Sequence, residues 1–413
     1  MNGKCELLIP AGSLEVLKIA VIYGADAVYI GGDVFSLRAK AKNFSYEDMK
    51  EGIKFAHDRG VKVYVTANVL AHNDDIEIAK KYLSEIAALE PDAFIISDPG
   101  IVMIAKQVCP QIDIHISTQA NNVNYLTFKF WHDLGATRVV AGRELSLREI
   151  KQIRQNIPEG LEIEAFIHGA MCISYSGRCL LSNYMTKRDA NKGLCTHPCR
   201  WKYSLMEEKR PGEYFPVYEN ERGTYIFNSK DLCMVEHIPE LMESGIDSFK
   251  IEGRMKNALY VATVARTYRK AIDDFLQSED LYKKNMPWYL DQISDCTYRQ
   301  FTTGFFFNKP DENSQIYDSN TYIKEYTYLG IVSKVDKRGL CKIEQKNKFS
   351  VGENIEVMKP TGDNIVVTVK RILDEDGCEM NSAPHARQII YIDIGNEANV
   401  YDILRRKEEE HSV

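Results

Sequence analysis

Residues 6–32 read E-L-L-I-P-A-G-S-L-E-V-L-K-I-A-V-I-Y-G-A-D-A-V-Y-I-G-G and contain one complete strand–helix–strand unit. The apolar runs Glu6–Pro10 and Ala27–Gly31 show little alternation, which is typical of strands that are buried on both faces. Between them, Leu14–Tyr23 has the spacing of a helix, and the turn residues Gly24–Asp26 lead into the second strand. The stretch therefore predicts a parallel β–α–β unit.

Similar units continue along the first two thirds of the chain. Six more buried strands are predicted at Val61–Thr66, Ala93–Ser97, Asp113–Ser117, Arg138–Ala141, Glu162–Ile167 and Ser248–Glu252. Helices are predicted at Tyr46–Asp58, Ile76–Ala88, Tyr125–Leu134 and Leu147–Gln155. Eight β/α units favour a TIM-type barrel over an open doubly wound sheet, and no G-x-G-x-x-G follows the first strand to indicate a dinucleotide fold.

The chain is predicted to divide into two folded parts. The α/β TIM-type barrel covers residues 1–280, with a cysteine-bearing insertion at about 169–247 and a strong helix at Ala258–Leu276. A polar connector is expected over residues 281–326. From 327 to 405, short strands and tight turns predict a small antiparallel β-barrel domain, and residues 406–413 form a charged tail.

Composition narrows the class of protein. With 44% hydrophobic and 27% charged residues, the 413-residue chain is an ordinary globular protein. Its net charge of −7 argues against indiscriminate coating of nucleic acid but permits a local basic patch. The chain shows no apolar signal segment and no long uncharged stretch, so we expect neither export nor membrane insertion, and a cytoplasmic location.

Half of the ten cysteines lie within about sixty residues, at Cys172, Cys179, Cys195, Cys199 and Cys233. A disulfide framework suits small secreted domains. A structural zinc site normally uses tight C-x2-4-C pairs, and only Cys195 and Cys199 have that spacing. An iron–sulfur cluster accepts three or four thiolates from loops of irregular spacing, and we favour it. Buried cysteines without a ligand role are the remaining alternative.

Charged residues follow three of the predicted strands, on the face where such barrels carry their chemistry. Arg143 with Glu144, and Glu252 with Arg254, could hold a carboxylate-bearing small molecule through bidentate contacts. The alternative is that they form salt bridges between loops. His168 is a candidate general base or ligand, although a lone histidine is often structural.

Basic and aromatic residues surround the cysteines, namely Lys187, Arg188, Arg200, Trp201 and Lys202. Such a patch could bind an RNA backbone. An ordinary solvated loop explains the same residues. No G-x-S-x-G, H-E-x-x-H or P-loop motif is found, so the sequence does not support a hydrolase with a standard nucleophile or zinc site.

Residues 164–182, E-A-F-I-H-G-A-M-C-I-S-Y-S-G-R-C-L-L-S, resemble the signature of peptidase family U32, the collagenase-like proteases. Four further motifs extend the resemblance along nearly the whole chain. They are L-L-x-P-A-G at Leu7–Gly12, G-A-D-A-V-Y-I-G-G at Gly24–Gly32, N-S-K-D-L at Asn228–Leu232 and K-I-E-G-R at Lys250–Arg254. The chain is most similar to the branch of this family that makes 5-hydroxyuridine in tRNA.

That resemblance implies oxygen-independent hydroxylation of the wobble uridine of tRNA. It also implies prephenate as the source of the hydroxyl group and a 4Fe–4S cluster. The cluster ligands would be Cys172, Cys179 and Cys195, with either Cys199 or Cys233 as the fourth. By position, the strand-end arginines would hold a dicarboxylate such as prephenate, and a paralogous family member is a further candidate partner. The alternatives are a U32-type peptidase and a scaffold whose activity resides in a partner subunit.

Overall fold

Eight parallel strands close into a barrel in the computed structural model, which describes residues 5–32, 44–171, 181–186, 219–220, 223–224, 230–295, 300–308 and 325–408. The barrel strands are β1 (Glu6–Pro10), β2 (Ala27–Gly31), β3 (Lys62–Ala67), β4 (Ala93–Ile96), β5 (Asp113–Ile116), β6 (Arg138–Val140), β7 (Glu162–Ala170) and β11 (Ser248–Ile251). The ring closes because β11 pairs with both β7 and β1. The predicted TIM-type barrel is confirmed.

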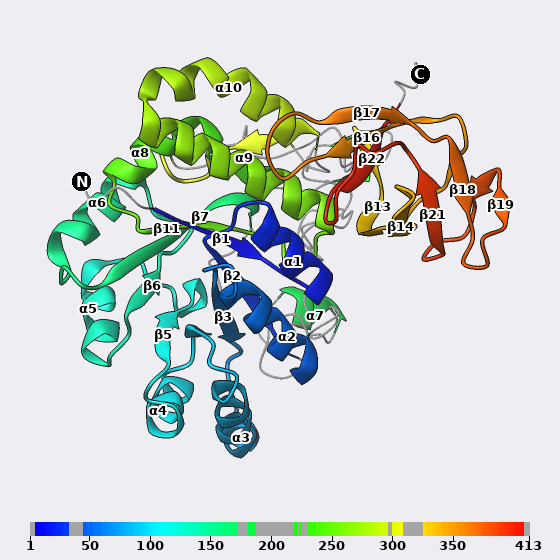
Figure 1. Ribbon diagram of the computed structural model, residues 1–413. Helices are drawn as coiled ribbons and strands as arrows, with labels where there is room; N and C mark the ends of the chain where they lie inside the picture. The colour runs from blue at the N-terminus through cyan, green and yellow to red at the C-terminus, as the bar shows by residue number, and fades with distance from the viewer. Residues whose placement is uncertain are drawn as a thin grey trace, which may run out of the picture.

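Helices surround this barrel (Figure 1). They are α1 (Leu14–Ile22), α2 (Tyr46–His57), α3 (Ile76–Ala87), α4 (Pro99–Val108), α5 (Tyr125–Asp133), α6 (Leu147–Asn156), α8 (Ile238–Glu243) and α9 (Ala258–Gln277). Polar N-caps fix where several of them begin. Ser45 with Asp48, and Ser146 with Glu149, each form a capping box that satisfies the first amide groups of α2 and α6.

Four of the described α-helices were not predicted from the sequence, namely α4, α7 (Leu181–Thr186), α8 and α10 (Glu279–Ser294). Helix α4 begins with Pro99 and Gly100, residues that favour turns, but proline is well tolerated in the first turn and Asp98 accepts a 2.8 Å hydrogen bond from the Gly100 amide. Helix α10 (Glu279–Ser294) occupies part of the expected connector. Its Pro287 and its polar composition suggested irregular structure, yet Ser278 caps its start.

The inserted segment contributes one short strand that pairs with the end of barrel strand β7. Strand β10 (Asp231–Cys233) runs antiparallel to β7 and pairs on its other side with β12 (Phe301–Thr302). Helix α7 (Leu181–Thr186) and strands β8 (Glu219–Asn220) and β9 (Gly223–Thr224) also belong to the segment. Strand β10 therefore extends the sheet beyond the closed barrel.

The C-terminal domain is a curled antiparallel sheet, as predicted. Its strand order is β17-β16-β22-β13-β14-β21-β18-β19. These strands are β13 (Tyr326–Val335), β14 (Cys341–Glu344), β16 (Asn354–Met358), β17 (Ile365–Thr368), β18 (Arg371–Leu373), β19 (Glu379–Met380), β21 (Ile389–Asp393) and β22 (Ile403–Lys407), with a separate pair β15 (Phe349–Ser350) and β20 (Ser382–Ala383). The domain packs on the barrel, where the Tyr23 hydroxyl donates to the Met358 carbonyl at 2.8 Å.

None of the described helices is long and apolar enough to cross a membrane.

Candidate active site

Neutral polar side chains line the carboxyl-terminal mouth of the barrel. An apolar cluster inside the barrel includes Tyr64 and Ile95. Since alternate residues of a strand share a face, Thr66 and Ser97 point to the same interior one layer higher. The Ser97 hydroxyl donates a 2.8 Å hydrogen bond to the Asn68 carbonyl, which fixes the ends of two neighbouring strands.

Arg254 reaches across this mouth. It follows β11, the last barrel strand, and its Nη1 donates to the Thr66 hydroxyl on β3 at 2.8 Å. Only 6% of the residue is exposed. A guanidinium held this way keeps a planar set of donors over the barrel interior, which is the arrangement that binds a carboxylate with two hydrogen bonds.

Arg143 is held by an aromatic ring. It follows β6, and its guanidinium carbon lies 3.9 Å from the centre of the Phe166 ring on β7. The residue is half-buried, as is its neighbour Glu144. Stacking on an aromatic face orients a guanidinium. The structure therefore offers Arg143 as a second oriented cation at the ends of the barrel strands.

A buried ion-pair network lies inside the barrel, among residues that were not predicted as site residues. The Lys250 ammonium contacts the Glu164 carboxylate at 2.5 Å, and Arg138 contacts the other oxygen of Glu164 at 3.2 Å. Glu164 is fully buried and Lys250 is 4% exposed. Burial lowers the pKa of Lys250, while the Glu164 charge acts in the opposite direction. The available signal was a charged residue inside an otherwise apolar strand.

Glu252 ties β7 and β11 to helix α9 through its backbone. Its amide donates to the His168 carbonyl at 2.9 Å, and its own carbonyl accepts from the Tyr260 hydroxyl at 3.1 Å. Gly169, at φ 106°, lies against this backbone, where an added Cβ would lie 2.7 Å from the Glu252 oxygen. A residue with a side chain would push the two strand ends apart.

His168 packs against helix α9. Its Nδ1 lies 3.3 Å from the Tyr268 hydroxyl, and its ring contacts Tyr260, Tyr268 and Phe301. Burial, reinforced by the Lys256 charge, lowers the pKa of His168 to about 3. An imidazole with that pKa is neutral near pH 7 and is a weak base. The geometry favours a structural role, and a catalytic role for His168 stays a prediction.

Cys233 joins the same cluster from the inserted strand. Strand register places Cys233 opposite His168, and its Sγ lies 3.7 Å from the Tyr268 hydroxyl. That hydroxyl also accepts a hydrogen bond from the Met234 amide at 3.1 Å. Burial raises the pKa of the Cys233 thiol to about 11. Metal ligation requires the thiolate, so a bound metal would have to displace this proton.

The other predicted ligands and the basic patch lie outside the described residues. These are Cys172, Cys179, Cys195 and Cys199, and Lys187, Arg188, Arg200, Trp201 and Lys202. Within the described part of the chain, no three His, Cys, Asp or Glu side chains are grouped so as to hold a metal ion. Among the predicted ligands, Cys233 alone lies in the described part of the chain, and its soft, half-buried sulfur is the donor type that iron–sulfur sites use.

Family models match both parts of the chain. The model of peptidase family U32 matches residues 12–316, and the model of the U32 C-terminal domain matches residues 324–405. The chain belongs to peptidase family U32. Its U32 motifs contact one another in the barrel: Glu164 of the signature pairs with Lys250 of K-I-E-G-R, and Gly12 of L-L-x-P-A-G lies directly against the Arg254 carbonyl.

Curated relatives of this U32 chain carry different kinds of name. The tRNA hydroxylation protein P1 of Bacillus subtilis is 39% identical over 98% of this chain and 96% of that protein. The tRNA hydroxylation protein P of Escherichia coli is 38% identical over 98% of this chain and 97% of that protein. A protein of Methanocaldococcus jannaschii that is named an uncharacterized protease is 41% identical over 86% of this chain and 88% of its own length.

Proposed function

We propose that this chain hydroxylates C5 of the wobble uridine in tRNA, without molecular oxygen and with prephenate as the source of the hydroxyl group. The observation that carries the proposal is the nearly full-length similarity to two relatives that are named tRNA hydroxylation proteins. Both the barrel and the C-terminal domain are included in that similarity, so the whole chain is matched and not only a common scaffold.

The arginines at the barrel mouth support the choice of a dicarboxylate. In the net reaction the uridine exchanges its C5 hydrogen for the hydroxyl of prephenate, and prephenate takes up the hydrogen and the two electrons that the uridine loses. Arg254 over the mouth and Arg143 on Phe166 supply two oriented guanidinium groups for the two carboxylates of prephenate. Their task is to bind and orient the co-substrate.

The proposed 4Fe–4S cluster would be held by Cys172, Cys179 and Cys195, with Cys199 or Cys233 as the fourth ligand. When bound, it would supply one-electron redox chemistry close to the barrel mouth. Cys233 lies on β10, next to the end of β7. A cluster ligand at that place would connect the inserted segment to the strand that carries Phe166.

Peptide hydrolysis, which the family name suggests, has less support in the described geometry. His168 is the candidate base, yet burial lowers its pKa to about 3 and its Nδ1 lies beside the Tyr268 hydroxyl. A general base works best with a pKa near the operating pH. Among the described residues, His168 does not meet this requirement for attack on a peptide bond.

A strain that lacks the gene tests the proposal. The wobble 5-hydroxyuridine of tRNA should be lost on deletion, restored by the wild-type chain and not restored by Cys179→Ser. Cys378→Ser is a matched control, because this cysteine is exposed in the C-terminal domain and should restore the modification. Unchanged modification in the deletion strain would overturn the proposal. Restoration of the modification by Cys179→Ser would instead show that the proposed reaction does not need the cluster.

A further inference from the structure

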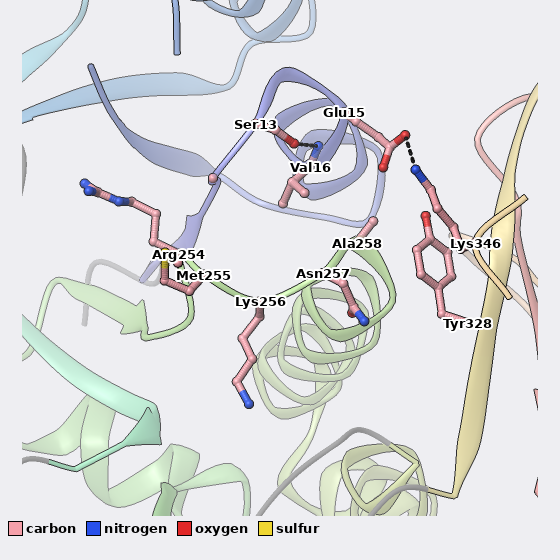
Figure 2. Close-up of a pocket in the computed structure, with 11 residues that line it drawn as sticks. Ser13, Glu15, Val16, Arg254, Met255, Lys256, Asn257, Ala258, Tyr328 and Lys346 are labelled. Atoms are coloured by element: carbon pink, nitrogen blue, oxygen red, sulfur yellow. Dashed lines mark hydrogen bonds and ion pairs between the residues drawn. The ribbon is translucent and has the colours of Figure 1, made fainter. Parts of the chain in front are cut away.

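A groove of about 380 Å³ lies between the barrel and the C-terminal domain (Figure 2). Its lining comes from the β1–α1 turn with the start of α1, from the segment Arg254–Ala258 before α9, and from Tyr328 and Lys346 of the C-terminal domain. Arg254 belongs to both sites: its guanidinium lies over the barrel mouth, while its residue borders the groove. The groove is therefore the immediate neighbour of the proposed active site.

Two helices begin at this groove. The Ser13 hydroxyl accepts from the Val16 amide at 3.3 Å at the start of α1, and the Asn257 side chain accepts from the Tyr260 amide at 2.9 Å at the start of α9. Each cap satisfies only one of the amide groups that a first helical turn leaves without an intrahelical partner. The positive ends of two helix dipoles thus converge on one place, which favours an anion.

The Tyr328 hydroxyl is an independent sign of a missing ligand. Tyr328 lines the groove with only 7% of the residue exposed, and its hydroxyl has no hydrogen-bond partner in the described part of the chain. Figure 2 shows the hydroxyl pointing toward the Lys346 side of the groove. Burial, with Glu15 nearby, holds the pKa of Tyr328 well above its ordinary value, so the group remains a hydrogen-bond donor. Buried donors normally have an acceptor.

Charged side chains of the lining act in both directions. Lys346 contributes a cation and Glu15 a carboxylate, whereas the Lys256 side chain points away from both of them (Figure 2). Glu15 contacts Lys346 at 3.4 Å, while Glu344 contacts the same ammonium at 3.0 Å. Both carboxylates would oppose an anionic ligand. The Lys346 ammonium, the two helix starts and the Tyr328 hydroxyl are the donors that the groove offers to one.

We propose that this groove binds a backbone phosphate of the RNA substrate. The inference rests on the proposed function, because it takes tRNA as that substrate. A phosphodiester presents two anionic oxygens, one for Tyr328 and Lys346 and one for the helix amides. RNA is the expected source because its backbone is continuous: a uridine in the barrel mouth brings its neighbouring phosphates to the bordering segment, Arg254–Ala258.

The test measures binding of a labelled, unmodified tRNA transcript to the full chain over a range of salt concentrations. Tyr328→Phe removes one hydroxyl and should weaken binding about tenfold. Lys346→Ala should weaken binding and lower the slope of log affinity against log salt by about one. Glu15→Gln should strengthen binding, because it removes the carboxylate that opposes the phosphate.

The matched controls come from the same domain. Lys342 on β14 and Tyr391 on β21 lie opposite each other on neighbouring strands of the C-terminal sheet and do not line the groove. Lys342→Ala and Tyr391→Phe should leave the affinity within twofold of the wild type. A further check on folding is the melting temperature, which should rise in Tyr328→Phe because the variant removes a buried hydroxyl without a partner.

The outcomes separate this inference from the proposed function. If the wild type binds tRNA and the groove variants match their controls, the groove inference is overturned while the proposed function stands. A second outcome is that inorganic phosphate raises the melting temperature of the wild type but not of Tyr328→Phe, while the tRNA affinity of the variants is unchanged. The ligand would then be a small phosphorylated molecule, and the RNA backbone would be overturned as the source of the phosphate. No binding of tRNA to the wild type overturns both.

Discussion

Arg254 is the residue whose placement depends most on the closed barrel. Its hydrogen-bond partner Thr66 lies 188 positions earlier in the chain, on a strand that is three places away around the ring. The pairing holds a guanidinium over the mouth in one orientation. A lysine at this position would keep the charge but lose the planar set of donors.

We therefore predict that Arg254→Lys lowers kcat/KM for prephenate by about 10- to 100-fold, the equivalent of one or two charge-assisted hydrogen bonds. This kcat/KM is measured from the steady-state rate of hydroxylation of a tRNA transcript at varied prephenate concentration. Arg148→Lys, at an exposed position of α6, is the matched control and should behave as the wild type. A normal kcat/KM in Arg254→Lys would exclude Arg254 from the binding of prephenate.

The fourth cluster ligand is also a question of single residues. Five cysteines are available for four places, so of Cys199→Ser and Cys233→Ser one variant should lose the iron and sulfide and the other should keep them. Protein that is purified without air, with iron and sulfide analysis and a visible absorption spectrum, gives the answer. Cys378→Ser should keep the full content, and Cys172→Ser should lose it. Iron-free wild-type protein would contradict the cluster altogether.

His168 predicts a pH dependence of stability. Its pKa is lowered to about 3 in the folded chain, against about 6.5 in an unfolded chain. Between these values the unfolded chain binds a proton that the folded chain does not, so stability is full above pH 6.5 and falls as the pH falls toward 3. Between pH 6.5 and 5, the free energy of unfolding of His168→Gln, measured in urea, should fall by about 2 kcal/mol less than that of the wild type. Identical losses would show that His168 titrates normally in the folded protein.

At the scale of elements, strands β7 and β11 are joined by the buried pair of Glu164 and Lys250 as well as by their backbone hydrogen bonds. Removing one partner leaves a buried charge behind, although Arg138 remains for Glu164. Replacing both partners with apolar residues leaves neither of the two buried charges behind. The pair should therefore behave as a unit.

We predict that Glu164→Leu lowers the free energy of unfolding by about 3–5 kcal/mol, and that the double variant Glu164→Leu/Lys250→Met loses less than the sum of the two single variants. Equilibrium unfolding in urea measures all three. The exposed pair of Lys54 and Asp58 on α2 is the matched control, since Asp58→Ala should cost less than about 1 kcal/mol. Additive losses at Glu164 and Lys250 would contradict the coupling.

Elements with a strong apolar pattern could be predicted from the sequence, and elements with a mixed pattern could not. The eight barrel strands are largely buried and mostly apolar, with single charged residues such as Glu164 and Lys250 among them, so their pattern was sufficient. Helix α10 was missed because its buried face consists largely of tyrosines that pack on α9, as when the Tyr289 hydroxyl contacts Asp274 at 2.5 Å. Those packing contacts are not visible in a local pattern.

For the whole molecule, the place of the candidate site followed from the fold class, but its contacts did not. Parallel strands of a barrel all end at one face, so Arg143 and Arg254 could be named as candidates from their positions. That Arg254 pairs with Thr66, or that Tyr328 of the C-terminal domain borders the same face, depends on long-range closure and domain packing. The iron and sulfide analysis of the cysteine variants tests the predicted roles of the cysteines in the insertion.

The central claim, hydroxylation of tRNA with prephenate, is tested most directly with the purified chain. Protein that is reconstituted with iron and sulfide without air would be incubated with an unmodified tRNA transcript and prephenate carrying an isotope label in its hydroxyl oxygen, and the nucleosides analysed by mass spectrometry. We predict labelled 5-hydroxyuridine at the wobble position, only when prephenate is present. Unmodified uridine from iron-loaded protein, or product without the label, would contradict the account.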